Sequence, residues 1–226
     1  MTTLLLLLSF VTSAYAGDPA PAPPPAPVSV PVSAPVKYAM SDTTGTIYVQ
    51  VFKDPTTLAA GLSHDHVMKA TGWTGSVTWD ATNPATCAVD ISIPVAKLEV
   101  DSNTMRAKVG YSGQLSDSDR SSVQESMLSS GQLDGSKYPN MTFKSSSCSG
   151  SGETIMVKGS LTIRGKAKEI TVPMKISASA TEFSAKGTFK AKHSDFGFTP
   201  FEALLGQLKN KDEMTFTVDV KGVPKG

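Results

Sequence analysis

Excess charge of one sign and long apolar segments are both absent from this sequence. Lysine and arginine number 21 against 20 aspartates and glutamates, a formal net charge of +1. The chain therefore lacks the basic excess that nucleic-acid binding requires, and it has no polybasic cluster that would hold it to an anionic membrane. The apolar run from Leu4 to Val11 is far shorter than the ~20 residues that span a bilayer. We expect no nucleic-acid partner and no membrane-spanning helix.

Signatures of catalysis are equally scarce. The serines form no G-x-S-x-G elbow, and no serine is marked out by a neighbouring base. The chain has only three histidines and two cysteines. We therefore expect a binding protein that has no chemistry of its own and needs no cofactor.

Residues 1–16 have the pattern of a secretory signal peptide. Small residues follow the apolar run, and Ala14 and Ala16 have the A-x-A spacing of a cleavage site before Gly17. Proline and alanine dominate residues 17–36, a composition that favours extended polyproline II and cannot bury a core. Residues 37–226 are enough for one domain with a sizeable core. We expect an exported protein, periplasmic or secreted, with a semi-rigid linker before its folded domain.

Apolar and polar residues alternate through most of this domain, which is typical of half-buried β-strands. Turn-like breaks separate the alternating segments. These segments are Ile47–Val51, Trp73–Trp79, Cys87–Val95, Met141–Phe143, Ile155–Ile163, Ile170–Ile176, Phe183–Phe189 and Met214–Val220. Eight one-sided antiparallel strands can close into a barrel that is filled or holds one small ligand. The predicted fold class is therefore all-β, an eight-stranded antiparallel barrel, with a β-sandwich as the alternative.

Three glycines, Gly75, Gly159 and Gly187, lie on the predicted inward faces of these strands. A packed interior would place side chains there, so the glycines could make room for a ligand. They could equally mark bends where the barrel turns its corners. The sequence leaves both interpretations open.

Two short segments have a helical pattern. In the first, Thr199 is a possible N-cap and Pro200 occupies the first helical position. The apolar residues that follow are spaced to form one stripe on a helix, and they are Phe201, Leu204, Leu205 and Leu208. We expect this helix to be a lid over the barrel mouth. The second segment begins after Ser116 and places Val123 and Met127 on one side.

The sequence also contains longer phrases with a specific order and spacing. The most specific are YPNMTF, from Tyr138 to Phe143, and GSLTIRG, from Gly159 to Gly165. Two others are HDHVMKATGWTGSVTWD and SDFGFTPFEALLGQLKNKDEM. Together these phrases resemble the YceI-like family of secreted bacterial proteins, over nearly all of residues 38–220. The resemblance implies a lipocalin-like antiparallel β-barrel whose hydrophobic interior binds a long isoprenoid or another lipid.

Two of the three histidines stand one residue apart. If the chain is extended from Leu62 to Ala70, His64 and His66 both face inward. Such a pair can supply two ligands to one zinc ion, and His193 would be the third, as in some hydrolytic zinc enzymes. The alternative function is therefore a metal-dependent hydrolase. We favour the other interpretation, in which no metal binds and the histidines are hydrogen-bonded groups at the barrel rim or orient a ligand head group.

Cys87 and Cys148 are the only cysteines. In an exported protein an even pair is most simply a disulfide. Cys87 stands at the start of one predicted strand. Cys148 stands at the end of the strand that follows after the second helical segment, so the two cysteines meet if these strands pair antiparallel. Two buried thiols are the alternative.

The expected ligand is an apolar or lipid-like small molecule held by burial of apolar area, which is worth ~25 cal/mol per Å². The candidate contacts are the inward aromatic residues, with His64 and His66 at the polar end: Trp73, Trp79, Phe143, Phe183, Phe189 and Phe216. The sequence leaves the oligomeric state open.

Overall fold

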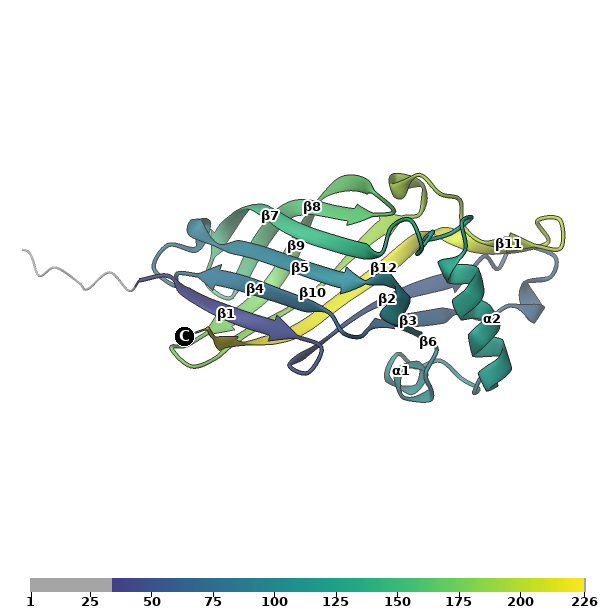
Figure 1. Cartoon of the computed structure of the whole chain (residues 1–226), viewed down its shortest axis with the longest axis horizontal. Helices are drawn as coiled ribbons and strands as arrows, with labels where there is room; N and C mark the ends of the chain where they lie inside the picture. The colour runs from purple at the N-terminus through teal and green to yellow at the C-terminus, as the bar shows by residue number, and fades with distance from the viewer. Residues whose placement is uncertain (1–33, 226) are drawn as a thin grey trace, which may run out of the picture. The chain divides into compact units, whose positions relative to one another are not determined.

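Strands make up most of the protein in the computed structural model, which describes residues 34–225 (Figure 1). The strands are β1 (Val36–Ser41), β2 (Gly45–Lys53), β3 (His66–Ala70), β4 (Thr74–Trp79), β5 (Ala88–Pro94), β6 (Leu98–Val100), β7 (Asn140–Ser151), β8 (Thr154–Ile163), β9 (Lys166–Ala178), β10 (Phe183–Lys192), β11 (Glu202–Ala203) and β12 (Leu208–Pro224). The α-helices are α1 (Asn103–Lys108) and α2 (Asp117–Leu128), and the short 3-10 helices are η1 (Ala60–Leu62), η2 (Pro84–Thr86), η3 (Val95–Lys97) and η4 (Ser194–Phe196). The predicted signal peptide, residues 1–16, and nearly all of the predicted linker, residues 17–36, lie outside the described residues.

Eight of the strands close into a ring of antiparallel neighbours. In order around the barrel they are β1, β4, β5, β7, β8, β9, β10 and β12, and pairing between β1 and β12 closes the ring. The closing pairs are Tyr38 with Pro224 and Ala39 with Val223. The prediction of an eight-stranded antiparallel barrel is therefore confirmed.

One member of the ring was not predicted. It is β1, whose buried residues are Tyr38 and Met40. The alternation in this strand is short and follows directly on a proline-rich stretch, so it gave little signal. The predicted strand at 47–51 is β2, which pairs with β12 but does not belong to the ring.

The first part of β12 carries this second set of strands. β2 pairs with β12 between Asn210 and Val220, β3 pairs with β2, and β6 pairs with β3. Within residues 34–225, β6 has no other strand partner, and α2 packs beside it. We call the part formed by β2, β3, β6, α2 and the beginning of β12 the helical end, and the part enclosed by the eight ring strands the ring end. Figure 1 shows α2 and the β11–β12 hairpin at the same end, away from the C-terminus.

The alternation that predicted the strands also places the core. In β8 the residues Ile155, Val157, Gly159, Leu161 and Ile163 are buried, and the residues that alternate with them are exposed or half-buried. Because successive side chains of a strand point to opposite faces, this pattern puts one apolar face inside the barrel. The core is therefore the barrel interior.

The helix predicted after Thr199 is wrong, because the segment forms a β-hairpin. Ala203 pairs with Leu208, and the Gly206 N–H donates to the Ala203 carbonyl at 3.1 Å. Leu204, Leu205 and Gly206 have φ angles of 53°, 54° and 82°, so the four residues between the paired Ala203 and Leu208 form a tight loop with three successive left-handed residues. The apolar spacing that suggested a helix does not mark a buried stripe here, because Leu204 and Leu205 are exposed.

The second predicted helix is confirmed as α2. The Asp119 N–H donates to Ser116 Oγ at 3.1 Å, and the Ser116 N–H donates to Asp119 Oδ2 at 3.3 Å. This capping box satisfies donors that the first turn would otherwise leave unpaired. Val123 and Met127 face the barrel interior and line a cavity there.

The disulfide between Cys87 and Cys148 is also confirmed. The two Cα atoms lie 5.9 Å apart, and both residues are buried. Cys87 lies just before β5 and Cys148 lies in β7, and these strands pair antiparallel as expected. The alternative of two free thiols is wrong.

The three inward glycines line neither of the interior cavities described below, and the space beside each Cα atom is already occupied. A Cβ atom on Gly159 would come within 2.6 Å of the Phe143 ring, and one on Gly75 would come within 2.9 Å of the Asp90 carbonyl. Neighbouring side chains and backbone therefore fill the space that a side chain would have taken. Gly159 in particular lets the Phe143 ring lie flat on β8.

Candidate functional site

The larger of two interior cavities, of about 290 Å³, lies at the helical end. We call it the wide cavity. Residues of β2, β3, β6 and β12 form one side of it, and α2 with Gln132 and Leu133 forms another. Most of its lining is apolar, but His66, His193 and Asn210 also contribute. An amphiphilic molecule could bury an apolar body here and still find polar partners.

A second cavity, of about 120 Å³, lies at the ring end. We call it the narrow cavity. Its lining comes mainly from the ring strands and β2. Among the described residues that line it, the only side chains with a polar group are Thr142, with its hydroxyl, and Trp79, with its indole N–H. The two cavities share three lining residues, Met141, Ile163 and Phe216. The interior thus changes from wholly apolar to partly polar along its length.

Five of the predicted aromatic contacts line the narrow cavity: Trp79, Phe143, Phe183, Phe189 and Phe216. Phe189 and Phe216 lie opposite each other on neighbouring strands, and their rings stack with centroids 4.8 Å apart. Trp73 is fully buried but lines neither cavity.

The two neighbouring histidines face different ways. His66 lines the wide cavity, whereas His64 is exposed and lines neither cavity. The expectation that both face inward is therefore wrong for His64. The physical reason is that β3 begins only at His66, so His64 lies in the irregular segment after η1 and does not follow the alternation of the strand.

A buried carboxylate fixes the orientation of His66. Its Nδ1 lies 2.6 Å from Asp101 Oδ2, and Asp101 is completely buried. Burial alone would raise the pKa of Asp101, but the hydrogen bond from His66, the charge of His66 and the Val67 N–H outweigh it and lower that pKa. Asp101 is thus a carboxylate that accepts a hydrogen bond from the Nδ1–H of His66. The other ring nitrogen, Nε2, remains for a ligand in the cavity.

Asp101 also joins His66 to a buried arginine. Its Oδ1 accepts from the Val67 N–H at 2.9 Å and from Arg106 Nη1 at 3.2 Å. The backbone of Asp101 has a φ of 50°, a left-handed conformation that a short polar side chain tolerates. The arrangement holds three elements together, because Val67 belongs to β3, Arg106 belongs to α1 and Asp101 follows β6.

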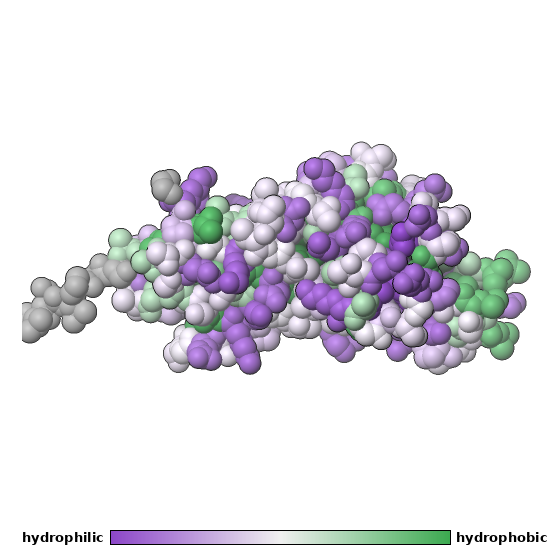
Figure 2. Space-filling model, turned by 90° about the horizontal axis from the view of Figure 1, so that it is seen from below, coloured by the Kyte–Doolittle hydropathy of each residue, from purple (hydrophilic) through white to green (hydrophobic). Residues whose placement is uncertain are grey.

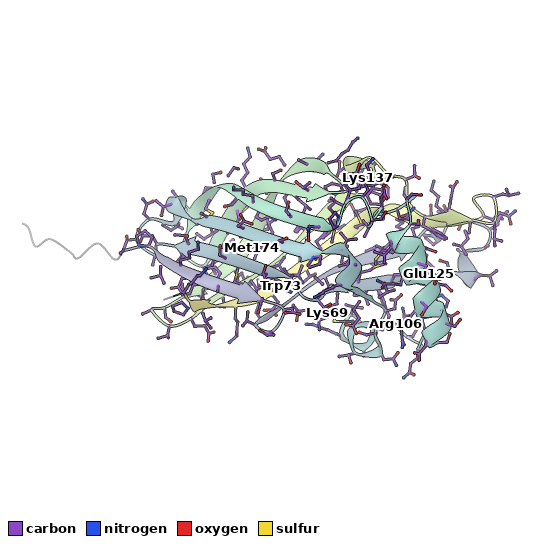
Figure 3. All side chains as sticks on the ribbon, viewed as in Figure 1. Lys69, Trp73, Arg106, Glu125, Lys137 and Met174 are labelled. Carbon is purple, nitrogen blue, oxygen red and sulfur yellow. A yellow bond between two sulfur atoms is a disulfide. The ribbon has the colours of Figure 1, made fainter. Side chains whose placement is uncertain are left out.

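Arg106 is only 4% exposed and is satisfied largely by backbone carbonyls. It donates to the carbonyls of Asp65 at 2.9 Å, Ser112 at 3.1 Å and Gly113 at 3.2 Å. Figure 3 shows Arg106 at the helical end and Met174, which lines the narrow cavity, at the ring end. Sequence reasoning missed both Asp101 and Arg106. Their only signal was a pair of charges set among the apolar residues Val100 and Met105.

His193 is the second histidine of the wide cavity. Its Nδ1 lies 2.9 Å from the carbonyl oxygen of Asp212, so Nδ1 carries the proton and donates it. The ring meets Phe198 edge-on, with centroids 5.2 Å apart. Burial lowers the pKa of His193 and keeps the ring neutral near pH 7. Its Nε2 is therefore an acceptor.

The three-histidine cluster required by a zinc hydrolase is not formed. His66 and His193 line the same cavity, but His64 lies outside it. Across residues 34–225, no group of three or more histidine, cysteine, aspartate or glutamate side chains is placed to hold a metal ion. The same residues include no helix long and apolar enough to cross a membrane.

A closed antiparallel barrel with a largely apolar interior defines the class of lipocalin-like barrel proteins, which bind small molecules. The comparison with protein families narrows this further. The sequence model of the YceI-like domain matches residues 50–222, so the chain belongs to the YceI-like family.

Solved structures of other proteins share the fold. BcnA of Burkholderia cenocepacia is 20% identical, with a TM-score of 0.56 over 77% of this chain and 95% of its own. The YCEI protein of Campylobacter jejuni is 17% identical, with a TM-score of 0.52 over 70% of this chain and 84% of its own. At this identity the likeness shows the fold alone. A search of curated proteins finds no match.

Proposed function

We propose that the protein is an exported carrier that holds an apolar or amphiphilic small molecule, such as an isoprenoid or another lipid, inside its barrel. The observation that carries the proposal is the junction of a wholly apolar cavity with one that contains two histidines. An apolar chain would occupy the narrow cavity, where each buried methylene contributes ~0.8 kcal/mol. A polar head group would lie in the wide cavity.

The orientation of the two histidines selects the kind of head group. With Nδ1 committed to Asp101 and to the Asp212 carbonyl, both rings offer Nε2 to the cavity. The neutral ring of His193 accepts through that atom, so a head group with a hydroxyl or another hydrogen-bond donor fits best beside it. In this proposal His66, not His64, marks the polar end of the ligand. The aromatic residues of the narrow cavity are its apolar contacts.

Binding without catalysis is the function we favour over hydrolysis. The hydrolase alternative needs three converging histidines, and the described residues bring only His66 and His193 to one cavity. The serines that line the wide cavity, Ser122 and Ser126, make no hydrogen bond to either of these histidines. The expected absence of a cofactor belongs to the same proposal.

Export is supported by two features of the chain. Residues 1–16 have the signal-peptide pattern, and the disulfide favours an oxidising compartment, which would be the periplasm or the outside of a bacterium. We propose that residues 17–36 then act as a spacer before the barrel.

The segment once expected to be a helical lid has a narrower role in this proposal. Phe201 lines the wide cavity, whereas Leu204, Leu205 and Leu208 line neither cavity. Phe201 would therefore limit entry by itself.

The test is to shorten the narrow cavity from inside. Val172 in β9 is buried and lines this cavity, and Thr171 beside it is exposed on the outer face. We expect Val172→Phe to weaken binding of a long-chain fluorescent fatty-acyl probe at least about tenfold, because two methylenes that no longer fit are worth ~1.6 kcal/mol and ~1.4 kcal/mol is a tenfold change. A short-chain analogue should lose little, and Thr171→Phe should change neither probe.

Two results would reject the carrier. One is that the unmodified protein binds neither a fatty-acyl nor a polyprenyl probe and yields no lipid to mass spectrometry when purified from its native host. The other is that the purified protein contains stoichiometric zinc and that a His66→Ala variant does not. This result would make the metal-dependent hydrolase the better proposal.

A further inference from the structure

The helical end carries an apolar surface that the barrel does not use for its own packing. Four leucines there are exposed, Leu58 by 90%, Leu62 by 71%, Leu204 by 57% and Leu205 by 102%. We call these four residues the leucine tip. Figure 2 shows a hydrophobic patch at the extreme end of the molecule, at the end where Figure 1 places the β11–β12 hairpin.

The leucine tip is one surface although it comes from two loops. Leu58 and Leu62 lie between β2 and β3, and Leu204 and Leu205 form the turn between β11 and β12. The Ala59 N–H donates to the Gln207 carbonyl at 2.8 Å, which joins the two loops directly. The four side chains therefore act as a single projecting knob.

The turn that presents Leu204 and Leu205 runs against local preference. Three successive residues of this four-residue loop have a positive φ, a conformation that asparagine and glycine tolerate best. Leucine in the left-handed region is disfavoured, yet two occur in succession with φ values of 53° and 54°. Strain of this kind persists where it places side chains for a purpose. Here it places two leucines at the most exposed point of the hairpin.

The charge around the tip indicates what the tip contacts. Residues 55–63 and 203–208 contain no charged side chain. Behind them stand charges of both signs, among them Lys53 and Glu202. Lys53 Nζ turns toward the loop and donates to the carbonyls of Ala60 at 3.2 Å and Ser63 at 3.3 Å. The tip can thus leave water without burying a charge, but it offers no positive field for anionic lipids.

The size and position of the tip distinguish a bilayer from a protein partner. Four leucine side chains expose less than the ~800 Å² that each partner of a standard protein complex buries. A few projecting apolar side chains are enough to enter the headgroup and acyl boundary of a bilayer. The tip also adjoins the wide cavity, since Phe201 and Asn210, which line it, flank the same hairpin.

We propose that the leucine tip inserts into the surface of a zwitterionic phospholipid bilayer and docks the helical end there. The docking sets the wide cavity against the membrane. It goes beyond cargo binding and does not depend on it, because empty vesicles are enough to observe it.

The decisive variant is Leu204→Asn with Leu205→Gly, which places residues that tolerate a positive φ at both positions and removes half of the tip. We expect flotation with phosphatidylcholine vesicles to show at least about tenfold weaker partitioning than the unmodified protein, from the apolar area lost. The melting temperature should stay the same or rise, because the turn is relieved of strain. Loss of binding then has no explanation in unfolding.

The matched control is Val223→Thr, a change of similar shape at an exposed apolar residue near the other end of β12. It should leave partitioning unchanged. Raising the salt concentration should not weaken the partitioning of the unmodified protein into the vesicles, because no charge contributes to it. The proposal is overturned if the unmodified protein does not float with phosphatidylcholine vesicles, or if the Asn-Gly variant floats equally well. It is also overturned if sedimentation shows that the tip joins two copies of the chain and that vesicles do not compete.

Discussion

The ring end and the helical end of the barrel enclose cavities of different chemistry. Around the narrow cavity every ring strand has a strand partner on both sides, and inward positions are filled by aliphatic and aromatic side chains. Around the wide cavity the sheet stops at β6, and α2 with the loop after it completes the wall. Among residues 34–225, histidine and amide side chains line the interior only there. The ring strands thus enclose a nearly apolar space, and the polar groups belong to the helical end, where they come from β3 (His66), β12 (Asn210) and the residue after β10 (His193).

The same difference applies to what holds each end together. The ring end is closed by strand pairing and by the disulfide between Cys87 and Cys148. The helical end is held by the buried network of His66, Asp101 and Arg106. One end therefore depends on covalent and backbone bonds, and the other on side-chain charges. Variants at each end should test this division.

The largest effect is expected from Asp101→Ala. The change leaves the Arg106 guanidinium buried without its carboxylate and the Val67 N–H without its acceptor. Breaking a buried pair in this way lowers the free energy of unfolding by roughly 3–5 kcal/mol. Urea unfolding measures it. Asp90→Ala, at an exposed carboxylate of β5, is the control and should stay within about 0.5 kcal/mol. Equal losses in the two variants would show that the network does not hold the helical end.

A somewhat smaller effect is expected from removing the disulfide. Cys87 and Cys148 are 61 residues apart, and the chain-entropy treatment gives about 4 kcal/mol at most for such a loop. Replacing both cysteines with alanine should lower the free energy of unfolding by up to this amount, while a probe bound in the wide cavity keeps its affinity. If the variant loses that probe as strongly as Asp101→Ala does, the two ends are not independent.

The smallest effect is a pH dependence at the helical end. Burial lowers the pKa of His193 from 6.5, so the unfolded chain takes up a proton at a higher pH than the folded chain does. The stability that comes from a neutral His193 is complete above pH 6.5 and falls as the pH drops from there toward the lowered pKa. The pKa of Asp101 is lowered from 3.8, so a further loss follows below that pH. The free energy of unfolding, measured between about pH 8 and about pH 4.5, should fall in the first of these steps.

His193→Asn separates this step from the general effect of acid. An asparagine side chain keeps an N–H for the Asp212 carbonyl but does not titrate. The variant should lose the decline that begins near pH 6.5 and keep the one below pH 3.8. An unchanged profile would mean that another group is responsible.

The barrel could be predicted from the sequence because its evidence is periodic. Strands such as β8 repeat buried residues at every second position, and a period of two is legible without any knowledge of the neighbouring strands. The disulfide followed from the same pattern, because antiparallel pairing brings Cys87 and Cys148 together. The five aromatic residues of the narrow cavity also lie on strands in which apolar and polar residues alternate. Their placement inside needed only the parity of each strand.

The wide cavity could not be predicted in this way. His64 and Leu204 lie in segments where the chain does not follow the alternation, so neither parity nor helical spacing describes them. The apolar spacing after Pro200 fits a helix and a hairpin equally. In the structure Gly206 adopts a left-handed backbone conformation, which a hairpin loop uses and a continuous helix does not. Asp101 and Arg106 meet through contacts between β3, the residue after β6 and α1. Such contacts depend on tertiary structure, which a single sequence does not display.

The pairing of β1 with β12 also bears on how the gene for this domain could be rearranged. The Lys225 N–H donates to the Lys37 carbonyl at 2.8 Å, so the first and last strands of the barrel run side by side to their ends. A few added residues could join them, and the exposed turn at Gly152 between β7 and β8 could be opened to provide new ends. A circularly permuted barrel of this kind would begin and finish far from the leucine tip. It could be inserted into another protein with its interior cavities intact.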